Sequence, residues 1–284
     1  MGTVVVGLNT LENCRAAVEW AADAADRAGA DLDIVCGVQP PPVVDTWSVG
    51  YGREVLDQLD AAAREELARA RDLVRDRVRG EVGVRLVHDH PRPALLAAAR
   101  GADLLVTGAR PHHRLRSGVL GGLQLGSTSL YAAGHAPCPV VVVRGAPAEG
   151  ARDLVVGFDG SPAAVAAARW AAGHAAATGG RVRVLLVQDP HRDGHRAGSL
   201  TAPVLEGFLD ALRVRVPGAR VSASVVRHHH PEDVLLEASG TCALLVVGAR
   251  GHSALASALG GCTSHAVLHQ AATPVAVVPR PAPV

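Results

Sequence analysis

The chain contains one pattern twice, and this internal repeat constrains its fold more than any other feature. Residues 4–9 match 154–159, 17–22 match 167–172, 102–110 match 242–250, and 136–140 match 271–275. Four matches in the same order indicate two copies of one domain. We place the domains at residues 1–146 and 151–284, with a short Pro- and Gly-containing linker between them.

Each copy alternates apolar strand-like runs with helix-like segments. The expected strands are 3–7, 32–38, 83–88, 103–107, 139–143, 153–158, 181–187, 220–226, 243–247 and 275–278. The expected helices are 12–28, 53–79, 92–100, 127–134, 162–177, 203–215, 232–239 and 263–270. Continuous Val/Leu runs are typical of parallel strands buried on both faces. The alternation therefore predicts an α/β fold with two doubly wound five-stranded parallel-sheet domains.

Doubly wound sheets bind ligands beyond the carboxyl ends of the strands, where the strand order reverses. If the first and fourth strands of each copy meet there, Asn9 and Gly108 lie at this point in the first copy. Asp159 and Gly248 lie there in the second copy.

A glycine-spaced stretch follows the fourth strand of each copy. In the second copy it runs from Gly248 to Ser264 and leads into a helix-like segment. A strand, a glycine loop, small hydroxyl residues and a helix start together aim backbone N–H groups at a phosphate. The first copy has a related stretch from Gly108 to Ser129.

The composition excludes several other classes of protein. The formal net charge is +1, and no basic stripe is interleaved with aromatic residues, so nucleic acid is not expected as a partner. No apolar run reaches the ~18 residues of a membrane span, and the N-terminus shows no signal-peptide pattern. Five scattered cysteines without a Cys-x-x-Cys motif argue against disulfides or zinc and favour a cytoplasmic location.

These motifs resemble the universal stress protein family in its tandem two-domain form. Nucleotide-binding members of that family show Gly, two residues, Gly, nine residues, then Gly followed by Ser or Thr. Gly248, Gly251 and Gly261 keep this spacing. The resemblance implies three-layer α/β/α domains of the adenine nucleotide alpha hydrolase-like type. It also implies a stress-response protein that binds ATP, with or without Mg²⁺.

The resemblance also assigns site residues by position. It places Asp159 beside the adenine and ribose, Val187 at the adenine edge, and the Ser264 hydroxyl near the phosphates. The candidate nucleotide-binding residues of the second copy are Asp159, Gly160, Val187, Gly248, Arg250, Gly251, Gly261, Cys262, Thr263 and Ser264. Those of the first copy are Asn9, Val38, Gly108, Gly126, Ser127, Thr128 and Ser129.

Both copies depart from the family pattern, the first copy more strongly. Asn9 replaces the acid, and Pro111 replaces Gly251, which removes a backbone donor and fixes φ. The first loop also carries a five-residue insertion. In the second copy Cys262 stands where a hydroxyl is expected, and a thiol is a weak donor. The second copy is therefore the preferred nucleotide site.

Simpler interpretations stay open for several of these residues. Asp159 could cap a turn, and Arg110 and Arg250 could be solvated rather than bound to phosphate. Cys262 could be a redox-sensitive thiol or a packed one. His228-His229-His230 matches His88-Asp89-His90, and a polar strand end explains both better than a metal site does.

No catalytic pattern is recognisable, so the chain is not expected to be an enzyme. It has no lysine for a P-loop, and no Gly-x-Gly-x-x-Gly follows either first strand. We expect ATP or a related adenine nucleotide to act as a regulatory signal. The alternatives are an interaction protein of the same fold that binds no nucleotide, and a slow ATPase.

The last strands of the two copies, at 140–143 and 275–278, are apolar and β-branched. Leaving such edges unpaired invites aggregation, and family members associate through them. We therefore expect the two domains to pair, and a homodimer could also form. The sequence identifies no protein partner.

Overall fold

The computed structural model describes residues 2–39, 48–109, 126–147, 149–189, 202–249 and 262–280, apart from the side chains of 48–53, 202 and 262. The chain divides into two compact units. Residues 2–109 and 126–140 belong to the first, and the described residues from 141 onward belong to the second. The division falls inside strand β5 (Val140–Val143).

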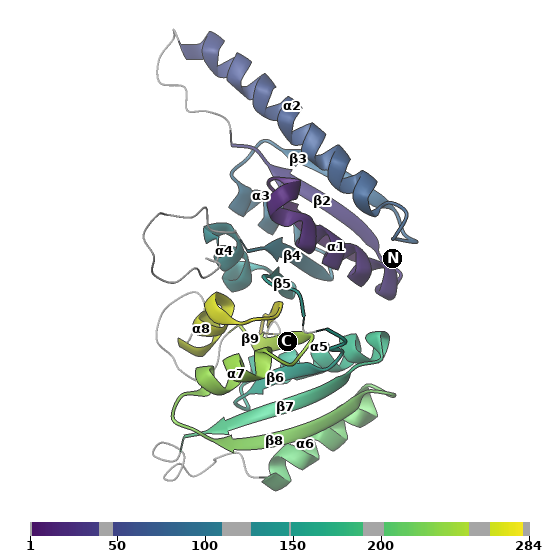
Figure 1. Ribbon diagram of the computed structural model, residues 1–284, viewed down its shortest axis with the longest axis vertical. Coiled ribbons are helices and arrows are strands. Elements are labelled where there is room, and N and C mark those ends of the chain that lie inside the picture. The colour runs from purple at the N-terminus through teal and green to yellow at the C-terminus, as the bar shows by residue number, and fades with distance from the viewer. Residues whose placement is uncertain are drawn as a thin grey trace. The chain divides into compact units, whose positions relative to one another are not determined.

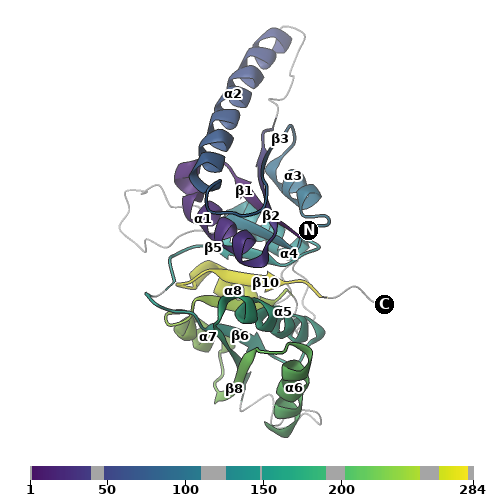
Figure 2. The ribbon, with the colours of Figure 1, turned by 90° about the vertical axis from the view of Figure 1, so that its right-hand side faces the viewer.

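The first unit contains strands β1 (Thr3–Leu8), β2 (Asp31–Gly37), β3 (Val82–Val87) and β4 (Leu104–Gly108). Its helices are α1 (Leu11–Ala28), α2 (Ser48–Val74), α3 (Pro91–Ala98) and α4 (Ser127–His135). These strands follow the order β3-β2-β1-β4 and pair in parallel. Helices α1 and α2 cover one face of the sheet, and α3 and α4 cover the other (Figure 2).

The second unit contains β6 (Leu154–Phe158), β7 (Arg181–Gln188), β8 (Arg220–Arg227), β9 (Leu244–Gly248) and β10 (Val275–Val278). Its helices are α5 (Pro162–Thr178), α6 (Ala202–Arg215), α7 (Pro231–Ser239) and α8 (Cys262–Gln270). The strand order is β10-β9-β6-β7-β8, again parallel; Figure 1 labels β6 to β9, and Figure 2 labels β10. The predicted α/β fold with mostly parallel sheet is confirmed.

Small and β-branched side chains fill the core of both units. Helix α5 buries seven alanines against its sheet, and the Val-rich strands β5 and β10 are buried along their whole length. Short side chains let the helices pack close to the strands, so a core with 2% aromatic residues is still well filled.

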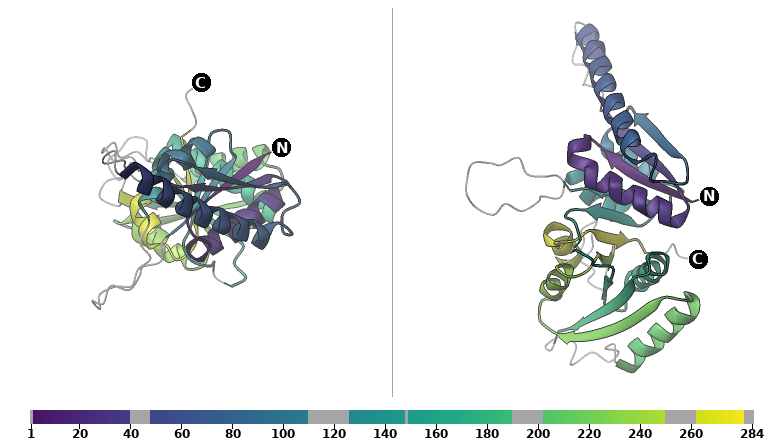
Figure 3. Two further views of the ribbon diagram at one scale, coloured as in Figure 1. Left: turned by 90° about the horizontal axis from the view of Figure 1, so that it is seen from above. Right: turned by 45° about the vertical axis from the view of Figure 1, so that its right-hand side comes forward.

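The element bounds agree with the sequence expectation to within a few residues, with α2 as the largest difference. It spans Ser48–Val74 rather than 53–79, and its first turns extend past the strands (Figure 3). Near its end the Arg77 N–H donates to the Val74 carbonyl, a bond that tightens and closes the last turn. How the two units sit against each other, including the expected pairing through their last strands, stays a prediction.

Candidate functional site

The ends of β6 and β9 form the centre of the candidate site in the second unit. The two strands are parallel neighbours, with Val156 opposite Val246. Asp159 and Gly248 therefore lie side by side at the carboxyl edge, at the point where the strand order reverses. This is the juxtaposition that the sequence predicted.

A tight turn holds Asp159 at the end of β6. Its Oδ1 accepts a hydrogen bond from the Ser161 N–H at 3.0 Å, and Gly160 takes a left-handed φ of 77°. Ser161 is buried and caps helix α5, because its hydroxyl accepts from the Ala164 N–H at 3.2 Å. The turn interpretation of Asp159 and the ligand interpretation are compatible, because an ionised carboxylate can accept several hydrogen bonds at once.

Gly248 lets β9 approach the first turn of α5 closely. A Cβ at this position would lie 2.8 Å from both the carbonyl carbon and the Cβ of Ala163, and 3.0 Å from the Ala164 nitrogen. Side chains do not normally come so close, so the glycine fixes the distance between the strand end and α5.

The start of α8 is tied to the same point. The Ser264 hydroxyl donates to the Gly248 carbonyl at 3.2 Å, and Thr263 beside it is half-buried. The structure therefore brings Asp159, Gly160, Gly248, Thr263 and Ser264 to one edge of the sheet. Arg250, Gly251 and Gly261 lie outside the described residues, as does the side chain of Cys262.

An aromatic pair beside the site was missed by sequence reasoning. Phe158, the last residue of β6, stacks on Phe208 of α6 with ring centroids 4.9 Å apart. These are the two phenylalanines of the chain, and that scarcity is the signal that could have paired them. They give Asp159 an apolar neighbour, and Val187 lies one strand away, opposite Val226.

The first unit repeats this geometry with different side chains. Ser129 donates to the Gly108 carbonyl at 2.8 Å, as Ser264 does to Gly248. Gly126 precedes α4, and Ser127 and Thr128 occupy its first turn, where Ser127 is exposed. The Val38 N–H donates a hydrogen bond to the Val87 carbonyl at 2.8 Å.

Asn9, at the position that matches Asp159, is occupied by local bonds. Its Oδ1 accepts from the Thr10 N–H at 2.7 Å and from the Cys14 thiol at 3.0 Å. The neutral amide thus holds the start of α1, and it brings no charge to the edge.

A carboxylate from α2 reaches this edge in the first unit. The Glu66 Oε2 accepts from the Leu11 N–H, the first of α1, at 2.6 Å, and its other oxygen pairs with Arg69. Burial, together with the charges of Cys14 and Glu66, raises the pKa of the Cys36 thiol on β2 to about 11. The carboxylate therefore lies near the ends of β1 and β2, where the resemblance places adenine and ribose. Helix α5 begins with Pro162, which has no N–H to offer such a group.

The histidines at the end of β8 are engaged with near neighbours. His229 Nδ1 lies 3.0 Å from the Asp189 carboxylate, and the Nδ1 of His228 contacts the His230 backbone. Across the described ranges no three His, Cys, Asp or Glu side chains are grouped to hold a metal ion. Within those ranges, too, no helix is both long and apolar enough to cross a membrane.

The two α/β units agree with a direct family match. The universal stress protein family model matches residues 1–144 and again 150–279. The chain belongs to the universal stress protein family. Its two units are thus tandem domains of that family, as the resemblance suggested.

Individual relatives show the same two-domain extent. Universal stress protein Rv2623 of Mycobacterium tuberculosis is 29% identical over 304 residues, which cover 96% of this chain and 95% of the relative. Universal stress protein Rv2005c of the same organism is 29% identical over 295 residues, with 96% of each covered. A universal stress protein structure from Archaeoglobus fulgidus aligns over 98% of both chains with a TM-score of 0.76. At 16% identity this last likeness concerns the fold.

Proposed function

We propose that the second domain of this universal stress protein binds an adenine nucleotide, with ATP as the expected ligand. The observation that carries the proposal is the Ser264 to Gly248 bond at the end of β9, the neighbour of β6. It brings the start of α8 to the strand end that lies beside Asp159. A helix start and a glycine strand end at this edge suit a phosphate, and a carboxylate next to them suits ribose hydroxyls.

The intact glycine spacing supports the same ligand. Gly248, Gly251 and Gly261 keep the interval that nucleotide-binding members of the family show. Phe158, buried at the end of β6 and stacked on Phe208 of α6, makes the interior next to Asp159 apolar.

The first domain is the weaker candidate because its charges oppose the ligand. Asn9 uses its amide oxygen locally, and Glu66 brings a negative charge to the α1 start. A helix N-terminus that already holds a carboxylate has less attraction left for a nucleotide. Pro111 further removes a donor from the sequence of its loop.

We propose a regulatory binding protein rather than an enzyme. The chain has no lysine to contact a γ-phosphate. We assign Asp159 to the sugar end of the ligand, and its carboxylate also accepts the Ser161 N–H in the turn. Occupancy of the site by nucleotide would then be the signal, and a protein partner would respond to it.

Calorimetric titration with ATP, run with Mg²⁺ and with EDTA, tests the proposal. The wild type should bind one nucleotide in the second domain. Asp159→Asn should weaken binding by about tenfold or more, because hydrogen bonds to a charged group contribute roughly 1.5–3 kcal/mol. The matched control Asn9→Ala should leave affinity unchanged.

Wild-type protein that gives neither heat nor a thermal shift with ATP would refute nucleotide binding and favour the interaction protein. Equal losses from Asp159→Asn and Asn9→Ala would refute the assignment to the second domain. Phosphate release should match a protein-free control. Release that Gly261→Val abolishes would instead establish an ATPase.

A further inference from the structure

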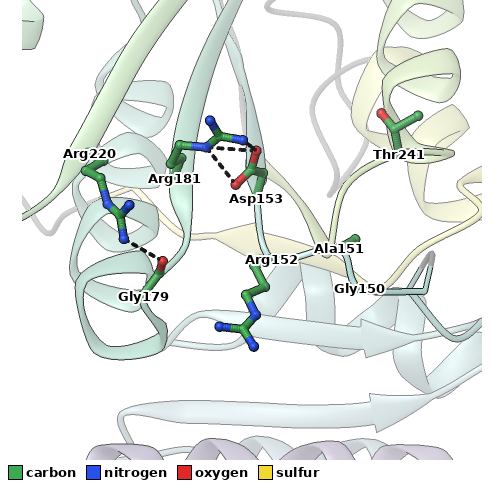
Figure 4. Close-up of a pocket in the computed structure, with 8 residues that line it drawn as sticks. All are labelled: Gly150, Ala151, Arg152, Asp153, Gly179, Arg181, Arg220 and Thr241. Carbon is green, nitrogen blue, oxygen red and sulfur yellow. Dashed lines mark hydrogen bonds and ion pairs between the residues drawn. The ribbon is translucent and has the colours of Figure 1, made fainter.

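A recess lies at the opposite edge of the second domain's sheet from the proposed nucleotide site, where β6, β7 and β8 begin. Its volume is about 300 Å³. Eight residues line it (Figure 4): Gly150, Ala151, Arg152, Asp153, Gly179, Arg181, Arg220 and Thr241. Three of the eight are arginines and one is an acid, so the lining is net positive.

Two of the arginines use only part of the guanidinium group for hydrogen bonds within the protein. Arg181 donates from Nε and Nη2 to the Asp153 carboxylate, with a shortest distance of 2.7 Å. Arg220 donates from Nη2 to the Gly179 carbonyl at 2.9 Å. A guanidinium has five N–H donors, so each retains donors after these bonds. Both side chains are exposed, with 68% of the Arg181 side chain accessible to solvent, so both guanidinium groups can be reached by an anion from solution.

Arg152 supplies the third guanidinium. Figure 4 shows it without a bond to any of the other residues drawn. The main chain of Gly180 packs tightly against that of Arg152, because a Cβ atom on Gly180 would collide with the Arg152 carbonyl oxygen. Gly150 and Gly179 adopt left-handed φ values of 73° and 72°. The glycines thus shape the recess and bring the strand starts together.

The same edge of the first domain carries the opposite charge. Arg181 and Arg183 of β7 match Asp31 and Asp33 of β2 in the repeat. Asp31 accepts from the Glu81 N–H at 2.9 Å, and Asp33 pairs with Arg85, so both acids bond within their own sheet. The positive recess is therefore specific to the second copy and does not follow from the fold.

Arg183 adds to the positive field of the recess. The hydrogen bond from Arg181 is the main cause of the lowered pKa of Asp153, and the charge of Arg183 lowers it as well. Asp153 therefore remains ionised at neutral pH and keeps Arg181 in position.

We propose that this recess, named here the arginine recess, binds a small anion that bears phosphate groups. Guanidinium groups match phosphate oxygens in pairs, and three exposed arginines line this one recess. The volume lies at the lower end of ligand sites, so it suits a compact phosphorylated molecule rather than a macromolecule. The site is separate from the proposed nucleotide site and does not depend on it.

The test uses pyrophosphate as the probe and the full-length protein. Titration followed by amide NMR should show saturable shifts at Gly150 and Gly179. Arg152→Ala and Arg220→Ala should each weaken binding by about tenfold or more, given the strength of charged hydrogen bonds. The exposed Arg169→Ala on α5 removes the same charge elsewhere and should change affinity little.

Arg181→Asp combined with Arg183→Asp restores the residues of the first copy and should abolish the shifts. Arg181→Gln is the milder partner variant, and it should retain the fold and bind less tightly. Shifts that do not saturate, or that occur away from the recess, would overturn the proposal. So would an equal loss in Arg169→Ala, which would indicate a general charge effect. Citrate that binds as tightly as pyrophosphate would overturn the assignment to phosphate.

Discussion

Replacing Gly248 by alanine should destabilise the second domain, because the new methyl group has no space. Its Cβ would lie 2.8 Å from Ala163 atoms and 3.0 Å from the Ala164 nitrogen, where normal contacts begin near 3.5 Å. Both neighbours belong to the first turn of α5, and backbone atoms cannot rotate away. Overpacking of this kind costs about 1–3 kcal/mol. For a domain of this size that corresponds to a fall in Tm of several degrees, roughly 2–4 °C per kcal/mol.

The repeat supplies a matched control at Gly108. A Cβ there would meet its nearest atom, the Asn13 carbonyl oxygen, at 3.4 Å, with Cys14 and Ala17 beyond it. Gly108→Ala should therefore be neutral, or gain ~0.4–1 kcal/mol from reduced freedom of the unfolded chain. The same residue change at equivalent strand ends should thus lower the stability of the second domain but not that of the first.

Urea unfolding combined with hydrogen exchange by mass spectrometry can separate these outcomes. Gly248→Ala should lower the unfolding midpoint and speed exchange in α5 peptides. It should also weaken ATP binding, because the first turn of α5 follows Asp159 directly. If Gly248→Ala and Gly108→Ala shift the midpoint alike, or if α5 exchange is unchanged, the close approach of β9 to α5 does not limit stability and the reasoning is wrong.

Three further predictions concern single groups. Ser161→Ala removes a buried cap and should cost about 1 kcal/mol in urea unfolding. Burial raises the pKa of Cys36, Cys138 and Cys242 to about 11, so a thiol reagent at pH 8 should label them only after denaturant is added. Burial is the main cause that lowers the pKa of His269 below the ordinary 6.5, and the charges of His265 and Arg144 lower it as well. The unfolded chain then binds the proton more readily, and stability should decline as pH falls through 6.5. His269→Gln should flatten that decline in denaturation curves measured from pH 7 to 5.

Most of the fold could be predicted from the sequence because its signals are local and duplicated. Continuous Val runs and helix periodicity locate the strands and helices without knowledge of their neighbours. The first and fourth strands of each copy were expected to meet, and the pairing of Val156 with Val246 shows that they do. The end of α2 was misplaced, because Val78 and the alternating Arg and Asp residues continue the amphipathic pattern beyond Val74.

The candidate site could be predicted only in part, because contacts between distant residues leave no local pattern. Glu66 reaches Leu11 across 55 positions, and nothing near either residue indicates the contact. The direction of the Ser264 hydroxyl likewise depends on where α8 meets the end of β9. The arginine recess was missed for the same reason, since Arg181 and Asp153 are 28 positions apart.

The two copies have diverged chiefly in charge at the edges of their sheets. At the carboxyl edge the first copy has a neutral Asn9 and the Glu66 carboxylate, whereas the second has Asp159 beside Gly248. At the opposite edge acids in the first copy correspond to arginines in the second. Both domains share the same strand order and parallel pairing, so the fold itself does not require these charge differences. Ligands that carry phosphate meet repelling charges at both edges of the first domain. We therefore expect phosphate-bearing ligands to bind in the second domain, at the proposed nucleotide site on one edge and at the proposed arginine recess on the other.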